Sequence, residues 1–404
     1  MIVRRFLLWA RTAPADARAA GAAALAGAYL RSAMAPEDRR EAETALISLI
    51  DDPSPLVRRA IAEAIAGAAG APRVLVLGLI AEQSDIAALL LAQLPVLTEA
   101  DLVDAAAIGD GLAQRAIAQR PHLGCGAAAA LAEVGVEEAL VVLLGNPTAD
   151  LPLFSLERIF EREGASGRVR EALLARNDLP AGLRQAIAGR VSDALAAFVS
   201  GCGWLSEERS ARLARESTER VAVALASGGE ESDAPAIVAC LRENGRLTPG
   251  VILRSLLSGQ PALAEAAFAD LSGLPETRAR ALLWDRGGAG LKALYRKAGL
   301  PEALLPAFRA AVAALKRRGR HEPGPAAGGL DRGLLTEVLI ACELSEGLEG
   351  HALMALLRRL DAEAAREEAR LLADSLADDA ALALLVEADP DVLVELDLAD
   401  LRAA

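Results

Sequence analysis

The stretch DDPSPLVRRAIAEAIA, residues 51–66, decides the fold because a polar turn leads directly into one amphipathic helix. Val57, Ile61 and Ile65 recur at helical spacing and predict a buried stripe. Small alanines between them let neighbouring helices approach closely. The stretch therefore predicts a short helix that packs within a layer of similar helices.

Shorter echoes of this helix recur along the first half of the chain. The tripeptides IAE at 61–63, LAQ at 91–93 and IAQ at 117–119 are offset by 30 and 26 residues. Each follows a polar turn that contains an acid, and Pro95 and Pro121 end the second and third copies. Periods of this length are typical of stacked helix pairs, because each repeat buries its apolar side against its neighbours. We therefore predict an N-terminal helical-repeat solenoid.

A family resemblance accompanies this periodicity. The dipeptides DP at 52–53 and VR at 57–58 match the aspartate–proline turn and helix start of HEAT-like repeats and of the leucine-rich repeat variant. Residues 51–66 thus resemble one such repeat, and the weaker echoes extend the resemblance over about residues 45–190. The resemblance implies a solenoid of short helix pairs.

Glycine and proline mark helix corners in the second half. The pattern Gly-x-Pro occurs at 259–261, 273–275 and 299–301. Glycine accepts the left-handed conformation just past a helix, and proline opens the next helix. Ser206 and Thr248 stand where helix N-caps are expected. These signals predict a compact helical module, so that the whole chain belongs to the all-α class.

This module also resembles a known family. Residues 247–301 contain the motifs DRGG and GLKALY and are similar to the C-terminal part of an uncharacterised bacterial family, a domain of unknown function. Its members join HEAT-like repeats to such a helical module. The resemblance covers about residues 35–320 and implies an architecture, but it transfers no catalytic residue.

Composition divides the remainder of the chain. Residues 316–333 are rich in proline, glycine and charge, which predicts a mobile linker. From Asp361 to the C-terminus there are 13 acids against three arginines, whereas the whole chain has a net charge of −13. We predict a separable acidic helical appendage there. The predicted divisions are HEAT-like helical repeats at 1–190, a helical module at 191–320, a linker at 321–333 and the acidic helical appendage at 334–404.

The overall charge argues against nucleic acid or an anionic membrane as the partner, because both require a large basic face. A basic cluster at 316–320 is interpreted as a helix end or as a contact for the acidic segment, with nucleic acid as the alternative. Four widely spaced cysteines form no CxxC motif, so we expect free, buried thiols in a reducing compartment. The short apolar run at the N-terminus is too short for a secretory signal, and we expect a cytoplasmic protein.

Few residues could support catalysis or metal binding. His122 and Cys125 form H-x-x-C, but His122 takes the repeat position of Val96 and is interpreted as a turn or packing residue. His321 falls in the predicted linker without an obvious partner. His351, near a helix start, could accept a phosphoryl group in a phosphotransfer protein.

The segment LLWDRGGAGLKALYRKAGLP, residues 282–301, resembles a phosphate-binding loop only superficially. Lys292 is followed by Ala293 instead of the serine or threonine of a P-loop, and no strand precedes the glycines. We therefore predict that Gly287–Gly290 is a structural corner. Trp204 and Trp284 are expected in the core because aromatic residues are scarce.

The leading functional hypothesis is a non-catalytic helical-repeat scaffold or adaptor that binds a protein partner, with bacterial signalling as the setting. Acid–arginine pairs near the repeat turns make Arg58, Arg59 and Arg115 candidate partner-binding residues, although turn acids that cap helices would explain the same pattern. We predict no catalytic residue, cofactor or metal. The alternatives are a HEAT-like enzyme acting on a chromophore or nucleic acid, and a phosphotransfer signalling protein. The oligomeric state stays open.

Overall fold

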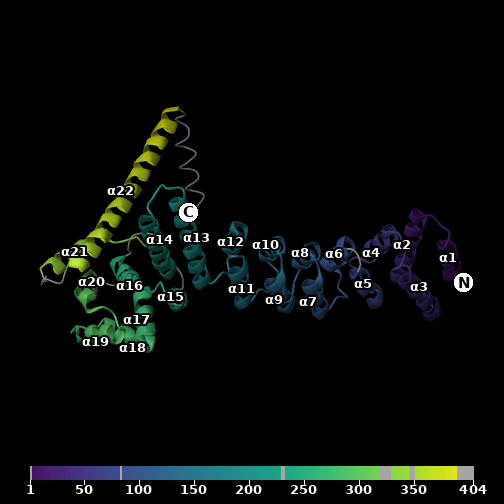
Figure 1. Cartoon of the computed structure of the whole chain (residues 1–404), viewed down its shortest axis with the longest axis horizontal. Helices are drawn as coiled ribbons and strands as arrows, with labels where there is room; N and C mark the ends of the chain where they lie inside the picture. Colours follow the sequence, from purple (N-terminus) through teal and green to yellow (C-terminus); the bar gives the residue numbers. More distant parts are fainter. Residues whose placement is uncertain (1, 82–83, 229–232, 319–328, 345–350, 389–404) are drawn as a thin grey trace. The chain divides into compact units, whose positions relative to one another are not determined.

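The computed structural model describes residues 2–81, 84–228, 233–318, 329–344 and 351–388 (Figure 1). These residues form α-helices and one short 3-10 helix, and no strand occurs among them. The predicted all-α class is therefore confirmed. The chain divides into two compact units, Met1–Leu179 and Pro180–Ala404. This division falls before the predicted boundary at residue 190, because the long helix that begins at Ala181 packs with the second unit.

The first unit is built from short helices joined by turns. Its helices are α1 (Ile2–Ala10), α2 (Ala15–Arg31), α3 (Pro36–Ser48), α4 (Pro55–Ile65), α5 (Arg73–Ile80), α6 (Ser84–Gln93), α7 (Glu99–Ile108), α8 (Gly111–Ala118), α9 (Cys125–Val134), α10 (Glu137–Leu144), α11 (Leu153–Glu163) and α12 (Gly167–Leu174). Helices α4, α6, α8, α10 and α12 pack one against the next in a first layer. Helices α7, α9 and α11 do the same in a second layer (Figure 1).

The repeat read from the sequence corresponds to this layering. Ile61, Leu91 and Ile117 lie in α4, α6 and α8, and all three side chains are buried. Pro95 and Pro121 lie in the turns that follow α6 and α8, as predicted. The period of the sequence is thus the distance along the chain between equivalent helices of one layer.

Arginine side chains connect one repeat to the next. Arg120, just after α8, donates hydrogen bonds to the carbonyl oxygens of Leu91 at 2.7 Å and Leu94 at 2.9 Å, at the end of α6. Arg162 of α11 reaches the end of α9 in the same way, through the carbonyl oxygen of Ala132 at 2.6 Å. The last carbonyls of a helix lack partners within that helix. Each arginine therefore supplies a C-terminal cap to the preceding repeat.

The second unit contains longer helices around one core. Its elements are α13 (Ala181–Gly201), α14 (Glu207–Gly228), α15 (Asp233–Glu243), α16 (Pro249–Leu257), α17 (Ala262–Ser272), α18 (Glu276–Leu283), α19 (Ala289–Lys297), the 3-10 helix η1 (Glu302–Leu304), α20 (Leu305–Arg318), α21 (Arg332–Glu343) and α22 (His351–Ala388). Phe268, Tyr295 and Phe308 form a buried aromatic cluster in the core, with ring centroids of Tyr295 and Phe308 5.1 Å apart. Scarce aromatic residues are thus concentrated where several helices meet.

The predicted helix corners and caps of this unit are present. Gly259, Gly273 and Gly299 have φ angles of +74°, +63° and +70°, which is the left-handed region that favours glycine. The Ser206 hydroxyl accepts a hydrogen bond from the amide of Arg209 at the start of α14. The Thr248 hydroxyl accepts one from the third residue of α16. Local sequence signals therefore set where these helices begin and end.

The described part of the expected acidic appendage is not separable. Leu334, Leu335 and Val338 of α21 are fully buried, and Leu357 and Leu360 of α22 join the same core. Residues 319–328, which include most of the predicted linker, lie outside the described residues. The prediction of a separate appendage is wrong for α21 and the first half of α22, because their apolar faces complete the core of the second unit.

A buried ion pair reinforces this attachment. Arg254 of α16 is 1 % exposed and donates to both carboxylate oxygens of Glu363 in α22, at 2.9 and 2.7 Å. Arg220 of α14 donates to the same carboxylate at 2.9 Å. Burial alone would raise the pKa of Glu363, but the hydrogen bonds from Arg254 and Arg220 outweigh it and lower that pKa. The last described helix is therefore held to the core by charge as well as by apolar packing.

The basic residues in the last turn of α20 also have partners in this unit. Arg317 and Arg318 form ion pairs with Glu337 of α21, at 2.9 Å for each arginine. Arg318 also pairs with Asp331 at 2.9 Å. The cluster thus meets the acidic part of the chain, as the sequence interpretation favoured. No helix in the described part of the chain has both the length and the apolar character needed to cross a lipid bilayer.

Candidate functional site

The structure gives structural roles to two of the three arginines that the sequence suggested for partner binding. Arg58 donates a hydrogen bond to the backbone carbonyl of Asp52 at 2.7 Å. Arg59 forms an ion pair with Asp85 at the start of α6. Arg115 is exposed on α8, and the three do not form one cluster of free cations. A role for them in binding a partner stays a prediction.

The turn acids cap helices and link repeats. Both oxygens of Asp52 accept hydrogen bonds at 2.8 Å from Arg18, and this contact is the main reason that the pKa of Asp52 is lowered. Asp110 accepts bonds from the amides of Leu112 and Ala113 and so caps α8. These acids therefore have structural roles. This agrees with the alternative explanation of the acid–arginine pattern, in which turn acids cap helices.

The histidines provide no assembled site in the described residues. His122 is exposed in a turn with a φ angle of +53°, in agreement with its interpretation as a turn residue. Among the residues that the structure describes, no group of three His, Cys, Asp or Glu side chains could hold a metal ion. His321 lies outside the described residues, and so does the side chain of His351.

The glycine-rich segment forms a corner between α18 and α19. Gly288 has a φ angle of +71°, and the Asp285 carboxylate accepts a hydrogen bond from the amide of Gly290 at 3.0 Å. Lys316 donates to the backbone carbonyl of Asp285 at 2.6 Å and holds the corner against α20. Lys292 is exposed on α19 and lies outside these contacts. The geometry agrees with the structural corner that the sequence predicted.

The distal half of the hairpin formed by α13 and α14 is unlike the rest of the second unit. The first half of α13 buries every second residue, including Leu183 and Ile187, but from residue 190 onward the helix exposes large apolar side chains. Val191, Leu195 and Phe198 are 40 %, 60 % and 59 % exposed. With the exposed Cys202 they form a stripe at spacings of four, three and four residues. Such spacing is typical of a helix that packs against another helix.

Trp204, at the tip of the hairpin, is exposed and not in the core as expected. Its side chain is 70 % exposed and packs edge-to-face on Phe198, with ring centroids 6.0 Å apart. Trp284, in contrast, is buried, and its indole nitrogen donates to Glu265 at 2.5 Å. Trp204 follows Gly203 in the turn after α13, where none of the described helices covers it. Scarcity of aromatic residues was therefore a poor guide to burial here.

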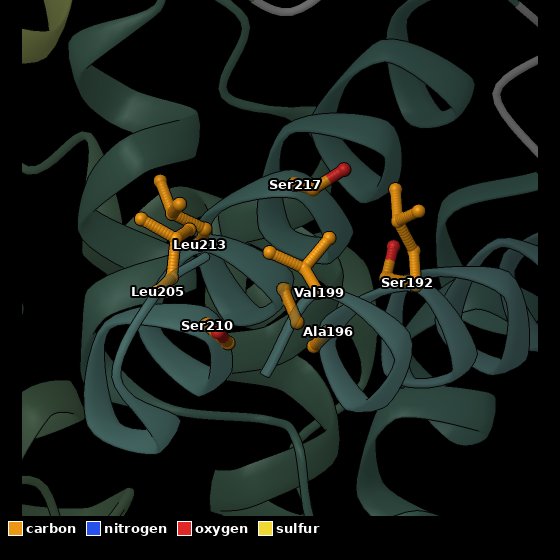
Figure 2. A pocket seen from close by; sticks show the side chains of 9 residues that line it. Ser192, Ala196, Val199, Leu205, Ser210, Leu213 and Ser217 are labelled. Atoms are coloured by element: carbon orange, nitrogen blue, oxygen red, sulfur yellow. The ribbon is translucent and has the colours of Figure 1, made fainter. Parts of the chain in front are cut away.

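An apolar groove runs between the two helices beside this stripe (Figure 2). Its volume is about 220 Å³. In Figure 2, Leu205 and Leu213 face Val199 and Ala196 across it, and hydroxyl groups stand along its edges. The residues that line it are Ser192, Leu195, Ala196, Val199, Leu205, Ser210, Leu213, Ala214 and Ser217. We call the groove, the stripe from Val191 to Cys202 and Trp204 together the hairpin face.

The sequence did contain a signal for the hairpin face. The segment VSDALAAFV, residues 191–199, has apolar residues on all sides of a helix and only one charge. A helix that is apolar all round is normally buried. Among the described helices, α14 packs along this segment and its large apolar side chains remain exposed. The cysteine prediction also needs correction: all four thiols are free, but Cys125 and Cys202 are exposed.

Comparison of the sequence with known protein families finds one match. Residues 86–337, more than half of the chain, match the sequence profile of the family described as "Uncharacterised protein conserved in bacteria (DUF2336)". The chain belongs to this family. The predicted resemblance to an uncharacterised bacterial family is thus confirmed, although the match begins and ends later than the expected residues 35–320. The hairpin α13–α14 lies wholly inside the matched region, whereas α22 lies beyond it. No curated protein and no solved structure matches the chain.

Proposed function

We propose that this DUF2336 chain is a non-catalytic helical-repeat scaffold or adaptor that binds another protein chain, and that the hairpin face is its docking surface. The observation that carries the proposal is the exposed apolar stripe beside an apolar groove. We further propose a cytoplasmic location, which the four free cysteines support because free thiols persist in a reducing compartment.

The size of the apolar surface supports a protein partner. Val191, Leu195, Phe198, Trp204 and Leu213 are all at least 40 % exposed. Together they present an apolar area on the order of 500 Å², near the upper end of what a soluble monomer exposes in one patch. Burying that area against a partner removes it from water, which is the main favourable contribution to protein association.

The dimensions of the groove support the same conclusion. Its volume of about 220 Å³ is below the range of about 300–1,000 Å³ typical of small-molecule pockets. It is suited to one or two large apolar side chains. The hydroxyls of Ser192 and Ser217 at its edges can hydrogen-bond to a polypeptide. The stacked helix pairs of the first unit, which we propose form a solenoid, add an extended surface for further contacts.

Site-specific crosslinking in the bacterium that encodes the protein tests this proposal. A photoreactive benzoyl-phenylalanine in place of Phe198 keeps the aromatic character of the stripe and should form covalent adducts with protein. The same residue in place of Ile108, which is 85 % exposed on α7, is the matched control and should form few. Adding Leu195→Glu to the first variant should abolish the adduct. Equal adducts at both positions, or none at 198, would refute the proposed docking surface.

A further inference from the structure

We infer that the partner of the hairpin face is a second copy of this chain, so that two α13–α14 hairpins pack across a two-fold axis as a four-helix bundle. The inference rests on the proposed function of the hairpin face and names its occupant. A two-helix hairpin with an apolar outer side cannot bury that side by itself. A bundle of four helices is the smallest symmetric arrangement that does so.

One hairpin carries both exposed aromatic side chains and a groove that can accommodate an aromatic side chain. Phe198 and Trp204 project from the surface as an edge-to-face pair, and they neighbour Val199 and Leu205 of the groove in the chain. In a two-fold interface, each contact made by one copy is repeated by the other. An aromatic side chain of each copy can therefore enter the groove of its partner. A groove of about 220 Å³ has the volume for such a side chain.

The charge distribution also favours self-association at this surface. Residues 361–404 carry most of the excess negative charge of each copy, so two copies repel each other most strongly through that segment. Residues near a two-fold axis face their own counterparts, and a charge there would meet a like charge. The stripe of Val191, Leu195, Phe198 and Cys202 contains no charge. It is therefore a place where two identical acidic chains can meet without that cost.

The exposed apolar area of the hairpin face approaches that of a small specific interface. The five exposed side chains contribute on the order of 500 Å² per copy. A standard interface buries about 800 Å² per partner. The groove walls and the exposed Ala194, one helical turn from Phe198, extend this area toward the lower end for specific interfaces, about 600 Å² per partner.

Light scattering coupled to size-exclusion chromatography, together with analytical ultracentrifugation of the full chain, tests the inference. We expect a dimer at about 50 µM, and Phe198→Glu should raise its dissociation constant about 30-fold or more. Circular dichroism and the thermal midpoint should change little, because Phe198 is exposed in the free chain. Ile108→Glu is the control and should remain dimeric. A monomeric wild type, or a Phe198→Glu variant that dimerises as well as the wild type, would overturn the inference.

A second measurement locates the interface. Purified chain with benzoyl-phenylalanine at 198 is mixed with isotope-labelled chain and irradiated. We expect crosslinked peptides that join residue 198 of one isotopic form to groove residues 192–217 of the other. Crosslinks only within one copy, or to another region, would overturn the inference. A monomeric purified chain whose residue 198 still crosslinks to a different protein in the cell would refute the second copy and leave the proposed function standing.

Discussion

The two units differ in their internal polar contacts. The paired residues are one repeat apart in the first unit and much farther apart along the chain in the second. In the first unit, Arg120 and Arg162 reach back by one repeat, between 26 and 30 residues. In the second unit, Arg254 and Glu363 are 109 residues apart. Contacts of one repeat length propagate from neighbour to neighbour, whereas a distant pair joins helices that are far apart in the chain. The first unit should therefore lose stability locally and the second as a whole.

The largest expected effect is on the long-range pair of the second unit. Glu363→Ala removes the acceptor of both hydrogen bonds that the buried Arg254 donates and leaves it beside the more distant Glu219 carboxylate, 3.5 Å away, so the free energy of unfolding should fall by about 3 kcal/mol. Urea unfolding followed by circular dichroism measures the change. Glu367→Ala is the control, because Glu367 pairs with Arg220 at 3.3 Å while both are about one-third exposed, and should cost under about 1 kcal/mol. If Glu363→Ala also cost under about 1 kcal/mol, apolar packing alone would hold α22.

The same pair predicts a pH dependence. The pKa of Glu363 is lower in the folded chain than the ordinary carboxyl value of 4.5. Its ion pair therefore stabilises the fold above that ordinary value, and the stabilisation is lost as the pH falls through the lowered pKa. The stability difference between the wild type and Glu363→Gln should shrink accordingly in acid. Burial raises the pKa of the neighbouring Glu219, whose contribution has the opposite sign, so the two variants Glu363→Gln and Glu219→Gln separate the effects.

A smaller and local effect is expected in the first unit. Arg120→Ala leaves the carbonyls of Leu91 and Leu94 without their cap and should cost about 1–3 kcal/mol. Hydrogen exchange should increase at the end of α6 and in the adjoining repeats, and not in the second unit. Arg115→Ala, on an exposed side chain of α8, should change stability by less than about 0.5 kcal/mol. Uniform loss of protection across both units would contradict the local character of the repeats.

The smallest effect tests one corner of the second unit. Gly288 has a φ angle of +71°, so Gly288→Ala should destabilise the chain by about 1 kcal/mol through backbone strain. Lys292→Ala, four residues away on an exposed face of α19, should be close to neutral. Thermal unfolding of both variants measures the difference. If the lysine variant were the more damaging, Lys292 would have a role that the corner does not explain.

Much of the local architecture could be predicted because it depends on neighbouring residues. The left-handed glycines at 259, 273 and 299, the hydroxyl caps at 206 and 248 and the repeat at 61, 91 and 117 all follow from conformational preference or short periodicity. The family resemblance came from motifs of the same kind. The candidate site was harder: VSDALAAFV indicates burial, and only the arrangement of helices shows that the segment is exposed.

The sequence by itself determined the all-helical class, the repeat and most helix ends, because backbone geometry and helical spacing are local properties. Only the tertiary structure decided that Arg254 meets Glu363, that α21 and the first half of α22 complete a core, and that Trp204 is exposed. Each of these depends on which surfaces meet across more than a hundred residues or on which surface is left uncovered. Which surfaces meet depends on the positions of whole helices in three dimensions, and a short window of sequence does not determine those positions.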